Sequence, residues 1–183
     1  MSRRPLALVT SLLVLAVVGC TPTTVLPPAG APSEEAPLFA SDEEALAAAT
    51  EAYEEFLAAL DAVLADPSGS QSTLERLASG DALLEAQDSI ESFRERRWRL
   101  LGSRQVLNST LQQVNHLSGI AEVSIYVCET TEGTDVIDEG GESQVADERE
   151  ELTSFELILR FEEPETGVLH TRSLWPSEEI CLA

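Results

Sequence analysis

Cys20 is the residue whose chemistry its sequence surroundings define most sharply. Arg3 and Arg4 give the N-terminus positive charge, and an apolar run over 6–18 follows. Small residues then precede the thiol in the sequence Val17-Val18-Gly19-Cys20. A charged start, a short apolar stretch and small residues before a cleavage site are typical of secretory signal peptides. The run is shorter than the roughly 20 residues that span a bilayer, which disfavours an uncleaved membrane anchor.

The cleavage region resembles a bacterial lipobox, in which the cysteine after the cut receives a diacylglyceryl group. That resemblance implies a lipoprotein signal peptide over 1–19 and a mature protein that begins with lipidated Cys20. Acyl chains such as palmitate would then hold the protein on the extracytoplasmic face of the cell membrane. Arg3 and Arg4 also fit a twin-arginine signal, so both the Sec and the Tat export routes stay open.

The other two cysteines, Cys128 and Cys181, predict a disulfide bond. With Cys20 lipidated, they form a pair in an oxidising compartment, where such pairs usually cross-link. Metal binding is disfavoured because two cysteines alone are a poor ligand set, and His116 and His170 lie far from both in sequence. We therefore expect no metal and no cofactor.

The basic residues gather at one place in a strongly acidic chain. The 183 residues include 33 Asp and Glu against 11 basic residues, all arginine, so the formal net charge is −22. Four arginines surround Trp98: Arg94, Arg96, Arg97 and Arg99. They predict either a patch for an anion or an acidic partner, or arginines that pair with the protein's own carboxylates and cover apolar surface. The acidic balance argues against nucleic acid as a partner.

Candidate catalytic groups are few. Asp135 and Asp138 flank Val136-Ile137, and His116 follows a predicted strand. An Asp inside a pocket gains a raised pKa and can transfer protons, but all three residues are also typical of solvated surface positions. A calcium loop at 135–140 would lack the ligand series of an EF-hand. We therefore assign no catalytic residue and favour a non-enzymatic protein.

The elements that position these residues begin after a linker over 20–40, whose five prolines favour an extended chain. A capping box at Ser41 predicts a first helix, which carries one apolar face to about Asp66. A second capping box at Ser72 predicts a short helix. Asp81 is expected to cap a third helix, which ends at Gly102.

Alternating apolar residues predict strands over 106–114, 121–128, 153–161 and 170–175. The acidic stretch 130–150 is expected to be a long hairpin connection with a short strand at 134–138. Helices followed by strands indicate an α+β domain over 41–183, with the N-terminal helices packed on one face of an antiparallel sheet.

Several segments in combination carry a family resemblance. They are the lipobox and its Pro-rich linker, 52–57, 77–83, the strand over 121–128, 134–141 and the stretch from Trp175 to Cys181. This combination resembles the NTF2-like (cystatin-like cone) superfamily, as found in secreted lipoproteins of high-G+C Gram-positive bacteria. The resemblance implies a curved antiparallel sheet that wraps a long helix and leaves a pocket between them.

We therefore expect a lipid-anchored extracytoplasmic protein that binds a small apolar ligand or an envelope protein partner. One alternative is a cone-fold isomerase or dehydratase that uses a buried Asp, since enzymes of the superfamily place an Asp or an Asp/His pair inside the cone. The other is a structural cell-envelope protein whose pocket is filled by its own side chains. The sequence makes no prediction of oligomeric state.

Overall fold

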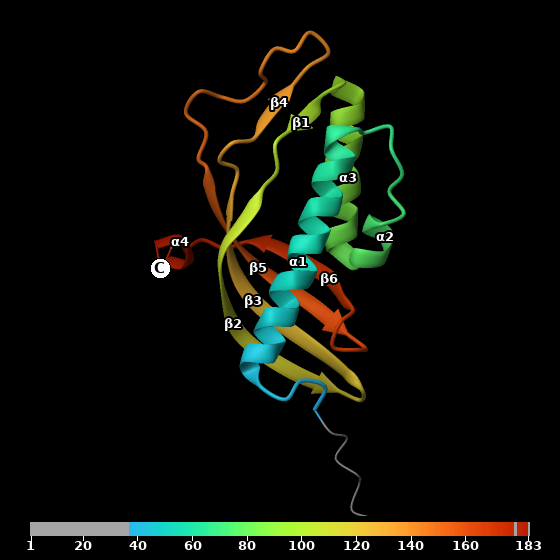
Figure 1. The fold of residues 1–183 in the computed structure, drawn as a ribbon, viewed down its shortest axis with the longest axis vertical. Coiled ribbons are helices and arrows are strands. Elements are labelled where there is room, and N and C mark those ends of the chain that lie inside the picture. The colour runs from blue at the N-terminus through green and yellow to red at the C-terminus, as the bar shows by residue number, and fades with distance from the viewer. Residues whose placement is uncertain (1–36, 178, 183) are drawn as a thin grey trace, which may run out of the picture. The chain divides into compact units, whose positions relative to one another are not determined.

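The computed structural model describes residues 37–177 and 179–182. The predicted signal peptide, Cys20 and most of the 20–40 linker lie outside the described residues. The helices are α1 (Asp42–Ala65), α2 (Leu74–Leu77), α3 (Gly80–Arg96) and α4 (Glu179–Leu182). The strands are β1 (Arg99–Leu101), β2 (Gln105–Leu117), β3 (Ile120–Thr130), β4 (Asp135–Ile137), β5 (Leu152–Phe161) and β6 (Gly167–Leu174) (Figure 1). In this part of the chain every helix is too short or too polar to cross a membrane.

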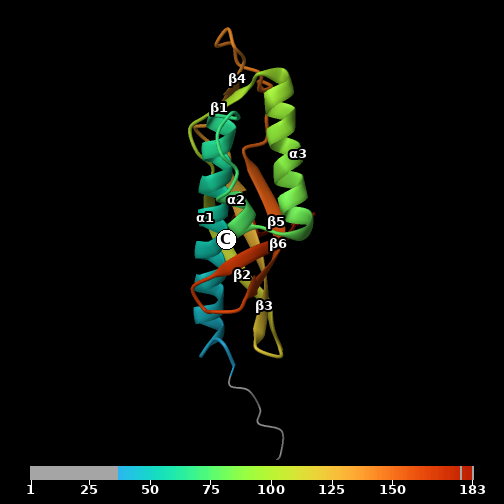
Figure 2. The same cartoon turned by 90° about the vertical axis from the view of Figure 1, so that its right-hand side faces the viewer.

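Four strands form one sheet in the order β2-β3-β5-β6, and each neighbouring pair is antiparallel. Figure 2 shows α1 and α3 side by side with this sheet, so the domain has a helical layer and a sheet layer. The structure therefore confirms the predicted α+β class with an antiparallel sheet. Residues 131–151 connect β3 to β5, in agreement with the predicted long connection.

The first helix begins and ends as its sequence predicts. The Ser41 hydroxyl accepts a 3.2 Å hydrogen bond from the backbone N–H of Glu44, and the Glu44 carboxylate accepts one from Ala40 at 2.7 Å. These bonds satisfy N–H groups that a helix start leaves without partners. The helix stops at Ala65, just before Pro67.

The starts of the next two helices differ from the prediction. The N-cap residue of α2 is Thr73 rather than Ser72, and it makes no side-chain cap. The third helix begins at Gly80, before the expected cap Asp81. The reason is tertiary: the backbone N–H of Ser79 donates a 2.8 Å hydrogen bond to the carbonyl of Leu169 on β6, which fixes where the helix begins.

Side-chain alternation fills the space between the two layers. The inward residues of β3 and β5 are buried, namely Ala121, Val123, Ile125, Val127, Phe155, Leu157, Leu159 and Phe161. Residues of the helices pack against them, including Phe56, Leu60 and Ile90. Ahead of α1, the ring of Phe39 contacts Phe161 edge-on at a centroid distance of 5.2 Å. The interior is thus packed with the protein's own apolar side chains.

A small second sheet joins β1 to β4, with Leu100 opposite Val136. The predicted short strand at 134–138 is confirmed, but its partner β1 comes from residues that the sequence placed in the third helix. Gly102 lets the two segments approach: its φ is +78°, and a Cβ there would collide with the backbone oxygen of Gly133.

The predicted disulfide between Cys128 and Cys181 is present, with the two Cα atoms 5.1 Å apart. Cys128 alternates with the inward residue Val127, so its sulfur points to the sheet face away from α1. The bond holds α4 against that face, where Trp175 also packs on Tyr126 at a centroid distance of 4.3 Å.

Candidate functional site

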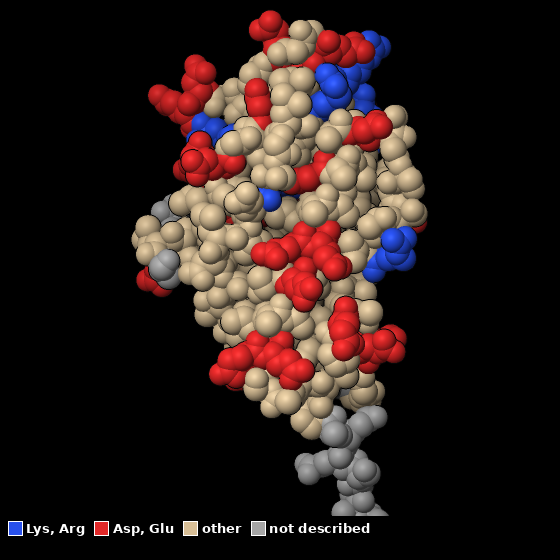
Figure 3. Space-filling model, viewed as in Figure 1, with Lys and Arg blue, Asp and Glu red and all other residues tan. Residues whose placement is uncertain are grey.

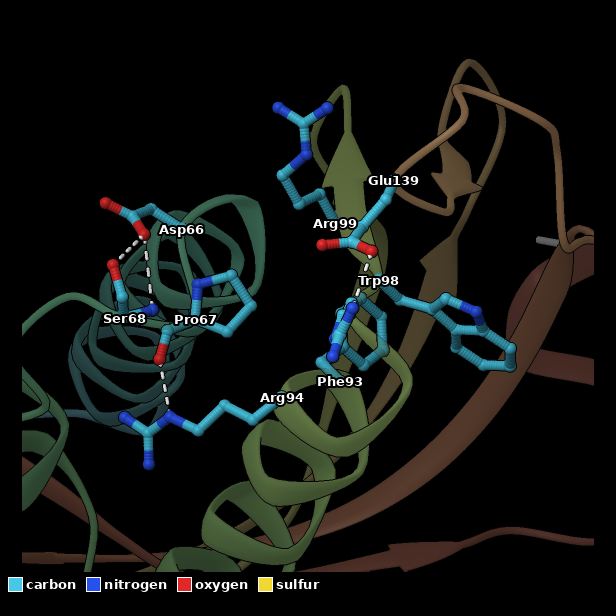
Figure 4. Close-up of a pocket in the computed structure, with 9 residues that line it drawn as sticks. Asp66, Pro67, Ser68, Phe93, Arg94, Trp98, Arg99 and Glu139 are labelled. Atoms are coloured by element: carbon cyan, nitrogen blue, oxygen red, sulfur yellow. Dashed lines mark hydrogen bonds and ion pairs between the residues drawn. The ribbon is translucent and has the colours of Figure 1, made fainter.

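The candidate site is a groove at the C-terminal ends of α1 and α3. It has a volume of about 550 Å³ and is lined by Asp66, Pro67, Ser68, Phe93, Arg94, Arg97, Trp98, Arg99 and Glu139. Three of the four arginines that the sequence singled out thus share one groove. In Figure 4, Arg94 and the turn after α1 lie on one side, Arg99 and Glu139 lie on the other, and Phe93 lies between them. We refer to this site as the arginine groove.

The end of α3 explains how the arginines come to line a groove. Arg97 has left-handed backbone angles (φ 57°, ψ 38°), and the N–H of Trp98 donates a 2.9 Å hydrogen bond to the carbonyl of Phe93. Such bonds are typical of a helix C-terminus. The chain then reverses into β1. The expectation that the helix continues to Gly102 is therefore wrong, since α3 ends at Arg96. The Arg97 side chain is 71 % exposed.

Two of the four arginines, Arg94 and Arg96, contact groups other than the carboxylates of the groove. Arg94 donates from Nε to the carbonyl of Pro67 at 2.5 Å. With the Gln71 amide turned to satisfy both groups, its oxygen also accepts from Arg94 at 2.9 and 3.1 Å. The guanidinium carbon of Arg96 lies 4.5 Å from the ring centroid of Trp98, a cation–π contact outside the groove. These two side chains hold the groove together.

The remaining two arginines face solvent across the groove. Arg97 donates to Oε2 of Glu139 at 2.9 Å, and both side chains are mostly exposed. Arg99 makes no hydrogen bond or ion pair with its side chain to any residue of 37–177 or 179–182. On the opposite wall, two hydrogen bonds from Ser68 lower the pKa of Asp66. The groove therefore combines two accessible guanidinium groups with two carboxylates, those of Asp66 and Glu139.

The charge distribution sets this end of the molecule apart. In the view of Figure 3 the largest group of arginine atoms lies at the end of the domain where α3 stops, while separate patches of carboxylates lie over the rest of that face. A chain with a net charge of −22 thus has one end where arginines gather.

The residues weighed for catalysis form no shared site: Asp135 and Asp138 bond to the loop after β4, and His116 lies on β2. Asp135 accepts a 2.7 Å hydrogen bond from the Ser143 hydroxyl, and Asp138 accepts from the backbone N–H of Gly140 at 2.8 Å. Both carboxylates therefore stabilise the loop after β4. His116 is exposed near the far end of β2. Within the described ranges, no group of three or more His, Cys, Asp or Glu side chains is placed to hold a metal ion.

Sequence reasoning missed a buried charge network between α1 and the sheet. Its members are Tyr53, Asp61, Arg104, Glu129 and Arg172. The carboxylate of Glu129, only 4 % exposed, accepts from Tyr53 at 2.7 Å and from Arg172 at 3.0 Å. Its other oxygen lies 3.6 Å from Arg104. Arg104 in turn donates from Nε to Asp61 at 2.7 Å, and its backbone N–H donates to the same carboxylate at 2.8 Å.

Two members of the network have shifted pKa values. Burial raises the pKa of Tyr53; the Arg172 guanidinium opposes that rise and Glu129 adds to it. Burial alone would lower the pKa of Arg172, but its contacts with Tyr53 and Glu129 raise it overall. The Arg172 guanidinium also lies 3.5 Å from the ring centroid of Phe155. Because both oxygens of Glu129 face guanidinium groups, the network is suited to holding α1, β3 and β6 together.

The period of β3 carried a signal for this network. Ala121, Val123, Ile125 and Val127 are inward positions, and Glu129 follows in the same phase. An acidic residue on an inward position needs a buried cationic partner. That rule could have identified Glu129 as paired, although not which arginine it meets.

Comparison with known proteins gives a fold likeness alone. Neither the protein-family models nor the curated proteins give a match to this chain. Among solved structures, the chain is similar to the intermembrane space region of the chloroplast protein ARC6, with a TM-score of 0.51 and 11 % sequence identity. The match covers 72 % of this chain and 97 % of the other. At this identity the likeness concerns the arrangement of helices and strands.

Proposed function

We propose that this protein is a non-enzymatic, extracytoplasmic binding module, anchored by lipid at Cys20, that captures a partner protein in the arginine groove. The observation that carries the proposal is the groove itself: exposed arginines flank apolar rings on a chain whose net charge is −22. Exposed, planar guanidinium groups beside aromatic surface are suited to protein interfaces, where arginine and aromatic residues are enriched.

A partner protein is favoured over a small apolar ligand by the packing of the interior. The side chains between the helices and the sheet are buried against one another, with Phe56 and Leu157 at 1 % and 0 % exposure. The arginine groove, in contrast, is open to solvent along walls from three separate segments. The filled interior also favours the second candidate, a structural envelope protein, which would need no groove.

The proposal includes an NTF2-like architecture, in which the sheet curls around the long first helix. Its support is the order of elements, three helices before a four-stranded antiparallel sheet, together with the sequence resemblance. If the sheet curves around α1, the groove lies at one end of the resulting cone and not between the sheet and α1.

The groove lies at the end of α1 opposite to the end where the chain enters the helix. The chain enters α1 at Asp42, and the groove begins at Asp66, directly after the helix. A helix of 24 residues is roughly 36 Å long at 1.5 Å per residue. An anchor at Cys20 with an extended linker would thus present the groove away from the lipid surface, towards proteins of the envelope.

Site-specific photocrosslinking tests this function. A photoreactive residue is placed at Ser68 on the groove wall or, as the matched control, at exposed Glu54 on α1. In intact cells we expect a discrete protein adduct from position 68 that disappears with Arg99→Gln. No adduct, or the same adducts from both positions whether or not Arg99 is present, would contradict a partner site in the groove.

The anchor has its own test. Mass spectrometry of the mature protein should find a diacylglyceryl group on Cys20, and Cys20→Ser should release the protein from the membrane fraction. A full-length, unmodified product would remove the lipid anchor from the proposal.

A further inference from the structure

The Arg97–Glu139 pair shows that a carboxylate can bind in the arginine groove. From it we infer that the groove takes an acidic peptide segment of the partner, and that Glu139 occupies the position of a partner carboxylate in the free protein. This inference rests on the proposed function, because it names the partner chemistry for the same groove. It adds that Glu139 competes with the partner for Arg97.

The ion pair between Arg97 and Glu139 has good geometry, but it contributes little free energy because both side chains are exposed. The two charged atoms are 2.9 Å apart, so the geometry is that of a charge-assisted hydrogen bond. The side chains are 71 % and 66 % exposed. Water screens exposed ion pairs, and such a pair shifts an equilibrium by about 5-fold at most. A carboxylate from a partner can therefore replace that of Glu139.

The turn that carries Glu139 does not depend on this pair. Asp138 fixes the turn by accepting hydrogen bonds from the backbone N–H groups of Gly140 and Glu142, at 2.8 and 3.1 Å. Its other oxygen accepts from Gln144 at 3.0 Å. Release of Arg97 thus needs rotation of the Glu139 side chain alone, and the loop after β4 keeps its shape.

Arg99 supplies the first contact for an incoming segment. Its side chain lines the groove and has no protein partner among the described residues. Phe93 and Trp98 line the same groove and pack edge-on, with ring centroids 6.1 Å apart. A peptide that carries both carboxylates and an apolar residue matches this combination of guanidinium groups and aromatic surface.

A peptide suits the groove better than a polyanion. Arg94 is already bound to Pro67, and Asp66 and Glu139 add negative charge to the walls. A long polyanion would also be repelled by a chain whose net charge is −22. A short segment with two or three carboxylates meets mainly the two accessible arginines.

Fluorescence polarisation with a defined probe tests the inference. The probe is a rhodamine-labelled, C-terminally amidated peptide of sequence Glu-Leu-Trp-Glu, and its counterpart has Gln at both Glu positions. The full chain is used in a non-ionic detergent at about 50 mM salt, where exposed charges are only partly screened. We expect the acidic probe to bind and the Gln counterpart to bind more weakly.

Glu139→Gln should raise the affinity for the acidic probe by about 2- to 5-fold, which is the range that an exposed ion pair can supply. Glu142→Gln is the matched control, because it makes the same change of charge in the same turn. Glu142 contacts Asp138 through its backbone: its N–H donates to the Asp138 carboxylate, and its carbonyl accepts from the Asp138 N–H. Combining Glu139→Gln with Arg97→Gln should abolish the gain, since the competition is for Arg97.

The outcomes separate this inference from the proposed function. If Glu139→Gln and Glu142→Gln raise the affinity equally, or neither does, Glu139 does not compete for Arg97 and the inference is overturned. If the acidic and Gln probes bind alike, the partner chemistry is wrong. Both results leave the Arg99-dependent crosslink from position 68 as an independent measure of whether the groove binds a protein.

Discussion

The hydroxyl group of Tyr53 on α1 donates a 2.7 Å hydrogen bond to Oε2 of Glu129 on β3, 76 residues further along the chain. The same hydroxyl accepts a 2.9 Å hydrogen bond from Nε of Arg172 on β6. One phenol group thus joins the long helix to two strands of the sheet. All three side chains are mostly or fully buried. If one of them is removed, water cannot easily replace it as a hydrogen-bond partner of the other two.

We expect Glu129→Gln to destabilise the fold by about 3 kcal/mol, because it leaves two buried arginines without their shared carboxylate. Urea unfolding measures the change. Glu54→Gln, on the exposed face of α1 next to Tyr53, is the control and should change stability by less than about 0.5 kcal/mol. Equal effects of the two variants would show that the network adds nothing to stability.

Tyr53→Phe should destabilise the fold by about 1 to 2 kcal/mol near neutral pH, since it removes one buried donor and one buried acceptor. The variant also changes the response to alkali. Burial raises the pKa of Tyr53 above its ordinary value of 10.0. The unfolded chain therefore loses this proton first, and the stability of the folded state falls as the pH rises above 10.

The expected slope is about 1.4 kcal/mol per pH unit above pH 10 for this one group. It is measured as the difference between the wild-type protein and Tyr53→Phe in urea unfolding at a series of pH values from 9 to 11. Parallel curves for the two proteins would contradict a protonated, buried Tyr53.

Loss of the disulfide should lower the stability by about 4 kcal/mol in the chain-entropy model for a separation of 53 residues. We expect a reducing agent to shift the urea midpoint of the wild-type protein, while the Cys128→Ser/Cys181→Ser variant shows no shift. A variant that still responds to the reductant would mean that another thiol reaction causes the effect.

Gly102→Ala should be more damaging than Gly133→Ala. Both glycines have positive φ, at 78° and 74°, so each substitution costs about 1 to 2 kcal/mol in backbone strain. Only the new methyl group at 102 collides with another segment, the backbone at Gly133 and Thr134. Thermal unfolding should therefore show a clearly larger loss for Gly102→Ala, and equal losses would argue against tight contact between β1 and the turn before β4.

Local signals in the sequence predict much of the fold. The Ser41 cap, the period of α1 and the alternation of β3 and β5 each depend on neighbouring residues, and all are confirmed. The cysteine pair was also identifiable, because few partners were available. The arginine cluster was located, but its shape was not, since the left-handed turn at Arg97 is set by the pairing of β1 with β4 rather than by the residues around it.

The buried charge network was out of reach for a different reason. Arg104 and Arg172 lie in segments whose sequence is typical of an exposed surface. Arg104 is 43 residues from its partner Asp61. Arg172 is 43 residues from Glu129 and 119 residues from Tyr53. No local pattern links such positions. Asp61 gave a hint, since it lies within the apolar face of α1 between Leu60 and Leu64, all of them buried.

β2 forms one border of the four-stranded sheet and pairs with β3 alone in that sheet. Its register shifts twice over 13 residues, between Val106 and Asn108 and between Leu111 and Gln113. Such bulges bend and twist a strand, so its outer backbone offers no straight row of donors and acceptors to another chain. At high local concentration this irregular border works against edge-to-edge pairing of copies into fibrils.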